Sequence, residues 1–196
     1  KLNQKEFCEE RGMRYTPEHK EKTRARLLAE GGSIAKKNGF ASTGVDTLMA
    51  AVGLTSGAFY AHFGSKAELL EAIVDKELGR SLDWFSDRNR EQLLQALQAY
   101  LSLAHVAHPE RGCPLPSLSA EVARADEQTR QTFERRLSEV VAAVQHHAAD
   151  TPTAWAIVAQ VAGAVMLARA MASEEARQQL LDGVLRQVQQ QLAKPG

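Results

Sequence analysis

The sequence predicts an all-α protein. Helix-favouring residues, chiefly Ala, Leu, Glu, Gln and Arg, dominate the 196-residue chain, and apolar residues recur at helical spacing over several long stretches. A chain of this length can bury a substantial core and is compatible with one or two domains. We therefore expect a purely helical fold.

The first helix is predicted to begin at Pro17 and to end near residues 38–39. Thr16 is a suitable N-cap, proline is favoured at the first helical position, and Asn-Gly is a common stop. Residues 1–15 are charged and lack a clear period, so we expect them to form a partly helical or mobile arm.

Residues 43–66 are the most informative segment, because they predict two short helices joined by a tight turn. Thr43 is the expected N-cap of a helix over residues 44–51, and Gly53 is expected to reverse the chain with a positive φ. A second helix of about two turns follows over residues 57–62. Its cap candidates are Thr55 and Ser56.

A third helix is predicted after Ser65, because Glu68 and an apolar run follow in the spacing of a capping box. Two short helices joined by a glycine-containing turn form a helix-turn-helix, whose second helix can enter the major groove of DNA. Small residues there allow close approach, and hydroxyl, imidazole and ammonium groups can bond phosphates or base edges. On these grounds we predict DNA contacts from Gly57, Ala58, Tyr60, His62 and Lys66.

The same segment resembles the DNA-binding domain of the TetR family of bacterial transcriptional regulators, with the similarity strongest over residues 17–75. The resemblance implies an all-helical homodimer, usually a repressor, which leaves its operator when a small molecule or chemical signal acts on the C-terminal domain. The residues that carry the resemblance are Thr43, Val45, residues 50–53, Gly57, Phe59, Tyr60, His62, Phe63, Ser65, Lys66, Leu69 and Leu70.

The resemblance also implies roles for single positions. Those similar to the phosphate-contacting residues of the family are Thr43, Ser56, Tyr60, His62 and Lys66. Those similar to its base-facing residues are Thr55, Gly57, Ala58 and Ala61.

The second helix lacks arginine and asparagine, so the bidentate contacts that specify guanine or adenine are missing. Base preference then rests on methyl contacts, on His62 or on DNA shape. Taken singly, Tyr60, His62 and Lys66 are ordinary core or surface residues, and only their shared spacing favours DNA binding. The alternative is a helical protein-interaction module without sequence-specific DNA binding, which would not depend on Tyr60 or Lys66.

Charge is unevenly divided along the chain, although the formal net charge is zero. Residues 1–66 contain eleven Lys and Arg against seven Asp and Glu, whereas the remainder contains thirteen against seventeen. The positive excess therefore lies on the half expected to face a double-stranded DNA operator. We see no apolar run of membrane-spanning length and no secretory signal, and expect no membrane partner and a cytoplasmic location.

Beyond residue 66 the sequence predicts long amphipathic helices, the first over about residues 69–85. The helix over about residues 152–171 is apolar on more than one face, and the last helix has a single stripe. We expect these last two helices to pack against the same pair in a second copy of the chain, with a core internal to one chain as the alternative. The expected domains are an arm (1–15), a helix-turn-helix DNA-binding domain (16–66) and an effector-binding and dimerisation domain (67–196).

A cavity for a small-molecule effector within the C-terminal helices is implied by the resemblance. Aromatic and methionine residues at helical spacing are more often simple core, so single assignments weigh little. The candidates for its walls are Trp84, Tyr100, Leu103, Leu118, Phe133, Trp155 and Met166.

Cys113 is a candidate sensing residue, because it precedes the start of a helix predicted over about residues 117–124, where the thiolate form is favoured. The surrounding sequence resembles the region that carries the sensing cysteine in electrophile-responsive repressors of the TetR family. Arg169 or Arg111 would supply positive charge nearby. An equally weighted alternative is that Cys113 is a small buried filler. With Cys8 as the only other cysteine, a disulfide scaffold is not expected.

The six histidines show no metal-ligand spacing, and no nucleophile, acid and base constellation stands out. We therefore predict no enzyme activity, no metal and no cofactor. The sequence as a whole predicts a homodimeric repressor that is released from a palindromic operator by a small hydrophobic or electrophilic compound.

Overall fold

The computed structural model describes residues 17–86 and 88–193, and the predicted arm and Thr16 lie outside them. All regular structure in these two ranges is helical, which confirms the predicted all-α class. The elements are α2 (Pro17–Asn38), α3 (Val45–Ala51), η1 (Ser56–Ala61), α4 (Lys66–Phe85), α5 (Arg90–Tyr100), α6 (Leu103–Ala107), η2 (Pro109–Arg111), α7 (Leu115–Val122), α8 (Glu127–Gln145), α9 (Thr151–Ala170) and α10 (Glu174–Ala193).

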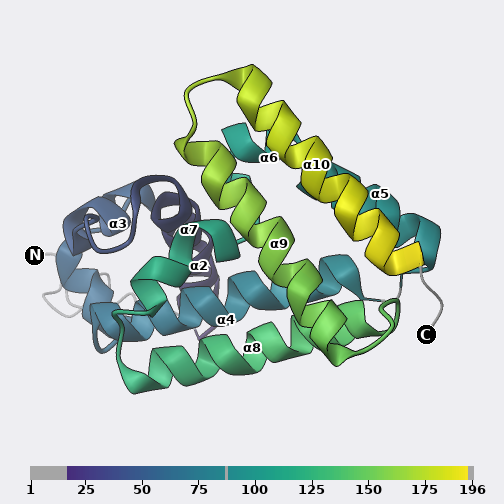
Figure 1. Ribbon diagram of the computed structural model, residues 1–196. Coiled ribbons are helices and arrows are strands. Elements are labelled where there is room, and N and C mark those ends of the chain that lie inside the picture. Colours follow the sequence, from purple (N-terminus) through teal and green to yellow (C-terminus); the bar gives the residue numbers. More distant parts are fainter. Residues whose placement is uncertain (1–16, 87, 194–196) are drawn as a thin grey trace, which may run out of the picture.

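The helices form two units joined by α4. We call α2, α3 and η1 the N-terminal unit, and α5 to α10 the C-terminal unit. Figure 1 shows α4 leaving the N-terminal unit and running alongside α8, while α9 and α10 form an antiparallel pair on the other side of the molecule. The predicted connecting helix is thus α4, which begins three residues earlier than the expected apolar stripe.

The N-terminal unit has its own buried core, to which the first half of α4 contributes. The aromatic side chains Phe59 and Phe63 are 0% and 1% exposed, as expected for residues that lock the second helix to its neighbours. Leu48 and Met49 of α3 and Leu69 of α4 are equally buried. This core fixes the helix-turn-helix as a rigid platform.

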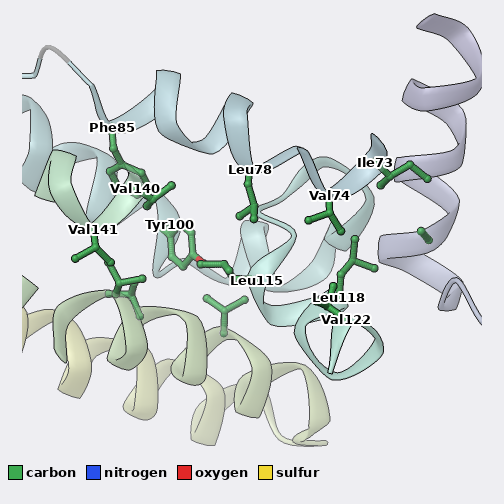
Figure 2. Packing of buried hydrophobic residues seen from close by; sticks show 14 of the residues in the cluster. Ile73, Val74, Leu78, Phe85, Tyr100, Leu115, Leu118, Val122, Val140 and Val141 are labelled. Carbon is green, nitrogen blue, oxygen red and sulfur yellow. The ribbon is translucent and has the colours of Figure 1, made fainter. Parts of the chain in front are cut away.

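The second half of α4 belongs to the core of the C-terminal unit. In Figure 2 its Leu78 and Phe85 point toward side chains from α7 and α8, among them Leu118 and Val140. Because one helix supplies both cores, the position of the N-terminal unit is tied to the packing of the C-terminal unit.

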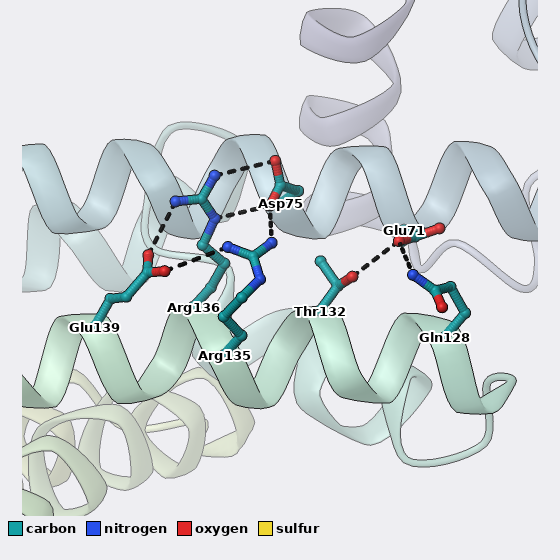
Figure 3. Close-up of polar contacts among 7 residues, drawn as sticks. All are labelled: Glu71, Asp75, Gln128, Thr132, Arg135, Arg136 and Glu139. Atoms are coloured by element: carbon teal, nitrogen blue, oxygen red, sulfur yellow. Dashed lines mark hydrogen bonds and ion pairs between the residues drawn. The ribbon is translucent and has the colours of Figure 1, made fainter.

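A polar network also fastens α4 to α8 (Figure 3). Asp75 accepts hydrogen bonds from Arg135 at 2.7 Å and from two nitrogens of Arg136 at 2.7 and 3.1 Å. One turn away, Glu71 accepts from the hydroxyl of Thr132 at 2.8 Å and from the amide of Gln128 at 3.0 Å. These bonds set the register of the two helices.

Several local predictions need correction. The helix after the first loop starts at Val45 with Gly44 as its N-cap, whereas the predicted cap, Thr43, donates its hydroxyl to the carbonyl of Gly39 at 2.7 Å. The helix after Cys113 begins at Leu115 rather than near residue 117, because Pro114 starts the turn.

Helix α9 corrects the expectation about apolar runs. Its 20 residues reach a mean hydropathy of 1.4, which by length and composition suffices for crossing a membrane. In this fold α9 instead packs against α8 and α10, and Ala154, Ile157, Val165 and Ala168 are fully buried. Burial within the C-terminal unit therefore accounts for part of this apolar composition.

Replacing Asp75 by Asn tests the α4–α8 network. The hydrogen bond from Arg136, followed by that from Arg135, lowers the pKa of Asp75, so its stabilising effect is present above the carboxyl's ordinary pKa and is lost as the pH falls through the lowered value. We expect Asp75→Asn to lower the free energy of unfolding by about 1 kcal/mol at pH 7, a modest value because the site is partly exposed and screened.

Urea unfolding at pH 7 and at low pH measures this effect, and the gap between the two proteins should close in acid. Asp83→Asn is the matched control, since Asp83 is exposed on the same helix. A deficit of equal size at both pH values would contradict the proposed role of the charge.

Candidate functional site

The helix-turn-helix is built by a few local contacts. Gly53 adopts the positive φ of 72° that the turn requires, and the N–H of Leu54 then bonds back to the carbonyl of Met49 at 2.9 Å. Ser65 caps α4 by accepting from the N–H of Glu68 at 3.1 Å, which confirms the predicted cap. The carboxylate of Glu68 reaches the N–H of Gly64, one residue earlier than the expected reciprocal bond.

The second helix of the motif is η1, a 3-10 helix with two turns. Its buried face carries Phe59, and the neighbouring Tyr60 is 71% exposed. Thr55, Gly57 and Ala61 are also exposed. Of the predicted DNA-contacting residues of this segment, Thr55, Gly57, Tyr60 and Ala61 are therefore accessible, while Ser56, Ala58 and His62 are half-buried.

Three predicted DNA-contacting side chains already have partners within the protein. The hydroxyl of Ser56 donates to Asp46, and that of Thr43 is buried against Gly39. The ammonium of Lys66 donates to the carbonyl of Ala41 at 3.1 Å and lies 4.8 Å from the ring centroid of Phe40. Thr43 thus braces the loop before α3, whereas the ammonium of Lys66 lies close to the main chain of that loop.

His62 lies beside a basic group that the residue-by-residue sequence assignments missed. Burial, reinforced by the charges of Lys20 and Arg24, lowers the pKa of His62, so its imidazole is neutral at pH 7. Lys20 and Arg24 are four residues apart on α2 and so lie on one helix face. The spacing of four residues between these two cations could have been recognised in the sequence. It places positive charge next to η1.

The N-terminal segment matches the family profile described as "Bacterial regulatory proteins, tetR family" over residues 27–73. This segment belongs to the TetR family. The chain is therefore a DNA-binding transcriptional regulator of the helix-turn-helix type. The match covers α3, η1, the second half of α2 and the first two turns of α4.

Similarity to individual TetR-family and other helix-turn-helix regulators extends beyond this segment. The chain is 24% identical over 162 residues to an uncharacterized HTH-type transcriptional regulator of Lactococcus lactis, covering 74% of this chain and 82% of that protein. TtgR of Pseudomonas putida is 36% identical, but over only 63 residues, which are 32% of this chain and 30% of TtgR.

Solved structures share the whole fold. The structure of E. coli NemR in its reduced form covers 89% of this chain and 100% of its own, with a TM-score of 0.73 and 24% identity. A TetR-family regulator from Pectobacterium atrosepticum covers 92% of this chain and 100% of its own, with a TM-score of 0.57 and 28% identity.

The C-terminal unit contains a cavity of about 300 Å³ beside Cys113. Trp84, Phe85 and Tyr100 form aromatic walls, and Arg80 adds a positive charge. Of the predicted wall residues, the cavity thus includes Trp84, Tyr100 and Cys113. We call it the Cys113 cavity.

The remaining predicted wall residues do not line this cavity. Leu118 is 1% exposed within the core, and Trp155 and Met166 are 41% and 50% exposed on α9. Arg169 instead donates to the hydroxyl of Ser117 at 2.7 Å and to the carbonyl of His105 at 3.2 Å. Leu103 and Phe133 are half-buried against the core.

Cys113 is held by a short chain of hydrogen bonds. Its N–H donates to Nε2 of His105 at 3.2 Å, and Nδ1 of His105 lies 2.6 Å from the carbonyl of Tyr100. These partners require a neutral ring with its proton on Nδ1, which agrees with a pKa of His105 lowered by burial. The hydroxyl of Ser81 lies 3.6 Å from Sγ of Cys113 and donates to it.

The loop that carries Cys113 touches the N-terminal unit directly. The ammonium of Lys36, near the end of α2, donates to the carbonyl of Gly112 at 3.0 Å and to Glu77 of α4 at 2.6 Å. The Lys36 and Glu77 side chains are only 1% and 4% exposed. A buried ion pair therefore joins α2, α4 and the residue before Cys113.

A second contact links α7 to the loop before α3. The carboxylate of Glu121 accepts from the N–H of Phe40 at 2.6 Å and from that of Ala41 at 2.8 Å. Hydrogen bonds to a charged acceptor are about twice as strong as neutral ones. The segment after Cys113 is thus connected to the N-terminal unit at both ends.

Among residues 17–86 and 88–193, no group of three His, Cys, Asp or Glu side chains is placed to hold a metal ion. His105 uses both ring nitrogens within the protein, and His108 lies 3.2 Å from Glu110. His105 and His108, which are three residues apart, are therefore each held by a different set of partners within the protein.

Replacing Lys36 by Met tests the junction between the units. The change leaves the buried carboxylate of Glu77 with Arg80 as its remaining charged partner, at 2.8 Å. Because losing one partner of a buried pair costs about 3–5 kcal/mol, we expect a fall of about 2–4 kcal/mol in the free energy of unfolding, softened by Arg80.

Chemical denaturation of the single variants and of Lys36→Met/Glu77→Met forms the appropriate double-mutant cycle. The double variant should recover part of the loss, since it buries no charge. If the two single losses simply add, the ion pair is not the coupling contact.

Proposed function

We propose that this TetR-family regulator is a homodimeric repressor that leaves a palindromic operator when a small hydrophobic or electrophilic compound acts at the Cys113 cavity. The observation that carries the proposal is the exposed face of η1, with Tyr60 outermost and cations of α2 beside it. We propose residues 16–66 as the DNA-binding domain and 67–196 as the effector-binding and dimerisation domain. Operator binding also places its site of action in the cytoplasm.

The DNA contacts divide by chemistry. Thr55, Gly57, Ala58 and Ala61 present small groups that allow base edges to approach the η1 backbone. Tyr60 reaches phosphate from its exposed position. Ser56 and Lys66 must exchange an internal partner for phosphate. His62 offers a neutral imidazole, and Thr43 supports the loop from inside.

Exposed apolar side chains on α9 support a homodimer. Trp155, Met166 and Leu167 are 41%, 50% and 52% exposed. Trp155 and Met166 are eleven residues apart, which is close to three helical turns, so they share one face. A second copy of α9 and α10 packed on this face would cover a patch that soluble chains rarely leave open.

The Cys113 cavity supports a compound with an aromatic or conjugated body. Its aromatic walls bury an apolar ring, its volume lies at the lower end of the range for small-molecule sites, and its open side gives access to Sγ. An adduct on Cys113 would displace Ser81 of α4 and shift Gly112 against Lys36. Both movements change the angle between α4 and α2, and hence the separation of the two η1 segments in a dimer.

Selection of duplexes from a random DNA pool, followed by Tyr60→Phe and Lys66→Ala, tests the DNA-binding part. We expect a palindromic site, a fall in affinity of about fivefold to tenfold for each variant and unchanged helicity by circular dichroism, because each change removes one polar contact per subunit. Lys66→Ala should also make binding less sensitive to salt.

Arg186→Ala removes a charge from the exposed side of α10 and should bind the selected site as the natural protein does. If folded protein enriches no duplex, or if Tyr60→Phe and Lys66→Ala bind with unchanged affinity, the helical interaction module becomes the better description.

Thiol reagents test the sensing part. A maleimide should release the natural protein and Cys8→Ser from the selected operator, and Cys113→Ser should stay bound, because only the latter lacks the thiol beside the cavity. Fluorescence anisotropy of labelled DNA reports the release. If the maleimide released Cys113→Ser from the operator equally well, Cys113 would have a packing role alone.

A further inference from the structure

A second concave surface, distinct from the Cys113 cavity, lies between the two units. It has a volume of about 490 Å³, and none of its lining residues lines the Cys113 cavity. The end of α2, the η2 region, the start of α7 and the residues around the α9–α10 turn all contribute to it. We call it the junction groove.

The junction groove is lined by basic residues and by no acidic ones. Lys36, Lys37, Arg169 and Arg177 all contribute to its walls. Lys36 is neutralised by Glu77, which leaves three cations converging from α2, α9 and α10.

These three cations lack carboxylate partners. Within residues 17–86 and 88–193 no carboxylate lies within 4.0 Å of Lys37, Arg169 or Arg177. Arg177 donates only to the carbonyl of Met171, at 3.0 and 2.5 Å. Elsewhere in the chain arginines that meet at one place do so around acids, as Arg135 and Arg136 do around Asp75.

Arg169 illustrates a cation that has no carboxylate in direct contact. It is half-buried, its guanidinium meets one hydroxyl and one carbonyl, and its Nε has no hydrogen-bond acceptor. Burial lowers its pKa, and Coulombic interactions with Tyr100, Cys113 and Glu110 partly offset that effect. A partly desolvated charge with no carboxylate in direct ion-pair contact favours the approach of an anion.

We propose that the junction groove binds a small metabolite with more than one anionic group, phosphate or carboxylate. Lys37 of α2 and Arg177 of α10 hold the anionic groups, and Arg169 of α9 adds positive potential. Such a ligand bridges α2 of the N-terminal unit to α9 and α10, and so favours one position of the DNA-binding helices. It acts as a second regulatory input, separate from the compound at Cys113.

Operator phosphates do not account for the groove. Lys37 follows Lys20 by seventeen residues on α2, which is about 26 Å along the helix axis. Lys20 lies near His62 and η1, so the groove is at the end of α2 remote from the recognition surface. A free anion reaches it without competing for DNA contacts.

Titration calorimetry of the full-length chain without DNA tests the proposal. Inorganic pyrophosphate and citrate are titrated separately at fixed ionic strength in a chloride buffer. We expect saturable binding of at least one anion, one per chain, with an affinity reduced at least fivefold in Lys37→Gln. Tighter binding of pyrophosphate identifies phosphate as the recognised group, and tighter binding of citrate identifies carboxylate.

Lys37 is exposed, and within the described residues no hydrogen bond or ion pair holds its side chain, which interacts only electrostatically with Glu110, so Lys37→Gln should fold normally. Arg186→Gln is the matched control and should bind as the natural protein does. The proposal is overturned if neither anion binds saturably, or if Lys37→Gln binds with unchanged affinity. Because DNA is absent, either outcome leaves the operator-binding proposal to its own test.

Discussion

The buried ion pair of Lys36 and Glu77 is the contact on which the relation between the two units depends. Charges so completely removed from water are tolerated only when paired, so α2 and α4 can move against each other only by carrying this pair along or by breaking it. Gly32 makes the approach possible, because a Cβ there would lie 3.2 Å from Oε1 of Glu77. The same ammonium bonds the carbonyl of Gly112, so the Cys113 loop shares the constraint.

Helix α4 turns this local constraint into a property of the whole molecule. Leu69 and Ile73 complete the core of the N-terminal unit, while Leu78 and Phe85 complete that of the C-terminal unit. The Asp75 network opposes sliding of α4 along α8. In the proposed mechanism, a change at Ser81 therefore alters the direction of α4 rather than its register. The movement that remains is a rotation of the N-terminal unit about its contact with the C-terminal unit at Lys36 and Glu77.

Features governed by neighbours in sequence could be predicted from the sequence. The bounds of α2, the positive φ of Gly53 and the Ser65 cap all follow from residue types at fixed spacing. Contacts between distant segments could not. Thr43 is an excellent cap by type, but Gly39 lies within reach of its hydroxyl and takes the bond instead. Lysine is usually solvated, so nothing local indicated that Lys36 would be buried.

The cavity walls show the same limit. Helical spacing identified apolar positions but not the side of the helix that would face open space, so Trp84 and Tyr100 line the cavity and Leu118 lies in solid core. Trp155 and Met166 were expected to face a ligand, yet they lie exposed on α9. Aromatic and sulfur-containing side chains serve a ligand site and a subunit interface equally well by composition. Only the packing of α9 against α8 and α10 separates the two uses.

The position of Cys113 weighs against a pure filler role. A filler is enclosed by other atoms, whereas Cys113 borders both the open 300 Å³ cavity and a small apolar gap near Val161. His105 fixes the main chain at Cys113, and with a neutral ring it brings no charge to the thiol. The positive charges that interact with Cys113 are those of Lys36 and Arg169, while Arg80 and Arg111 line the cavity with it. An adduct on Sγ cannot fit the small gap. It must grow into the cavity, where Ser81 and the aromatic walls of α4 and α5 receive the displacement.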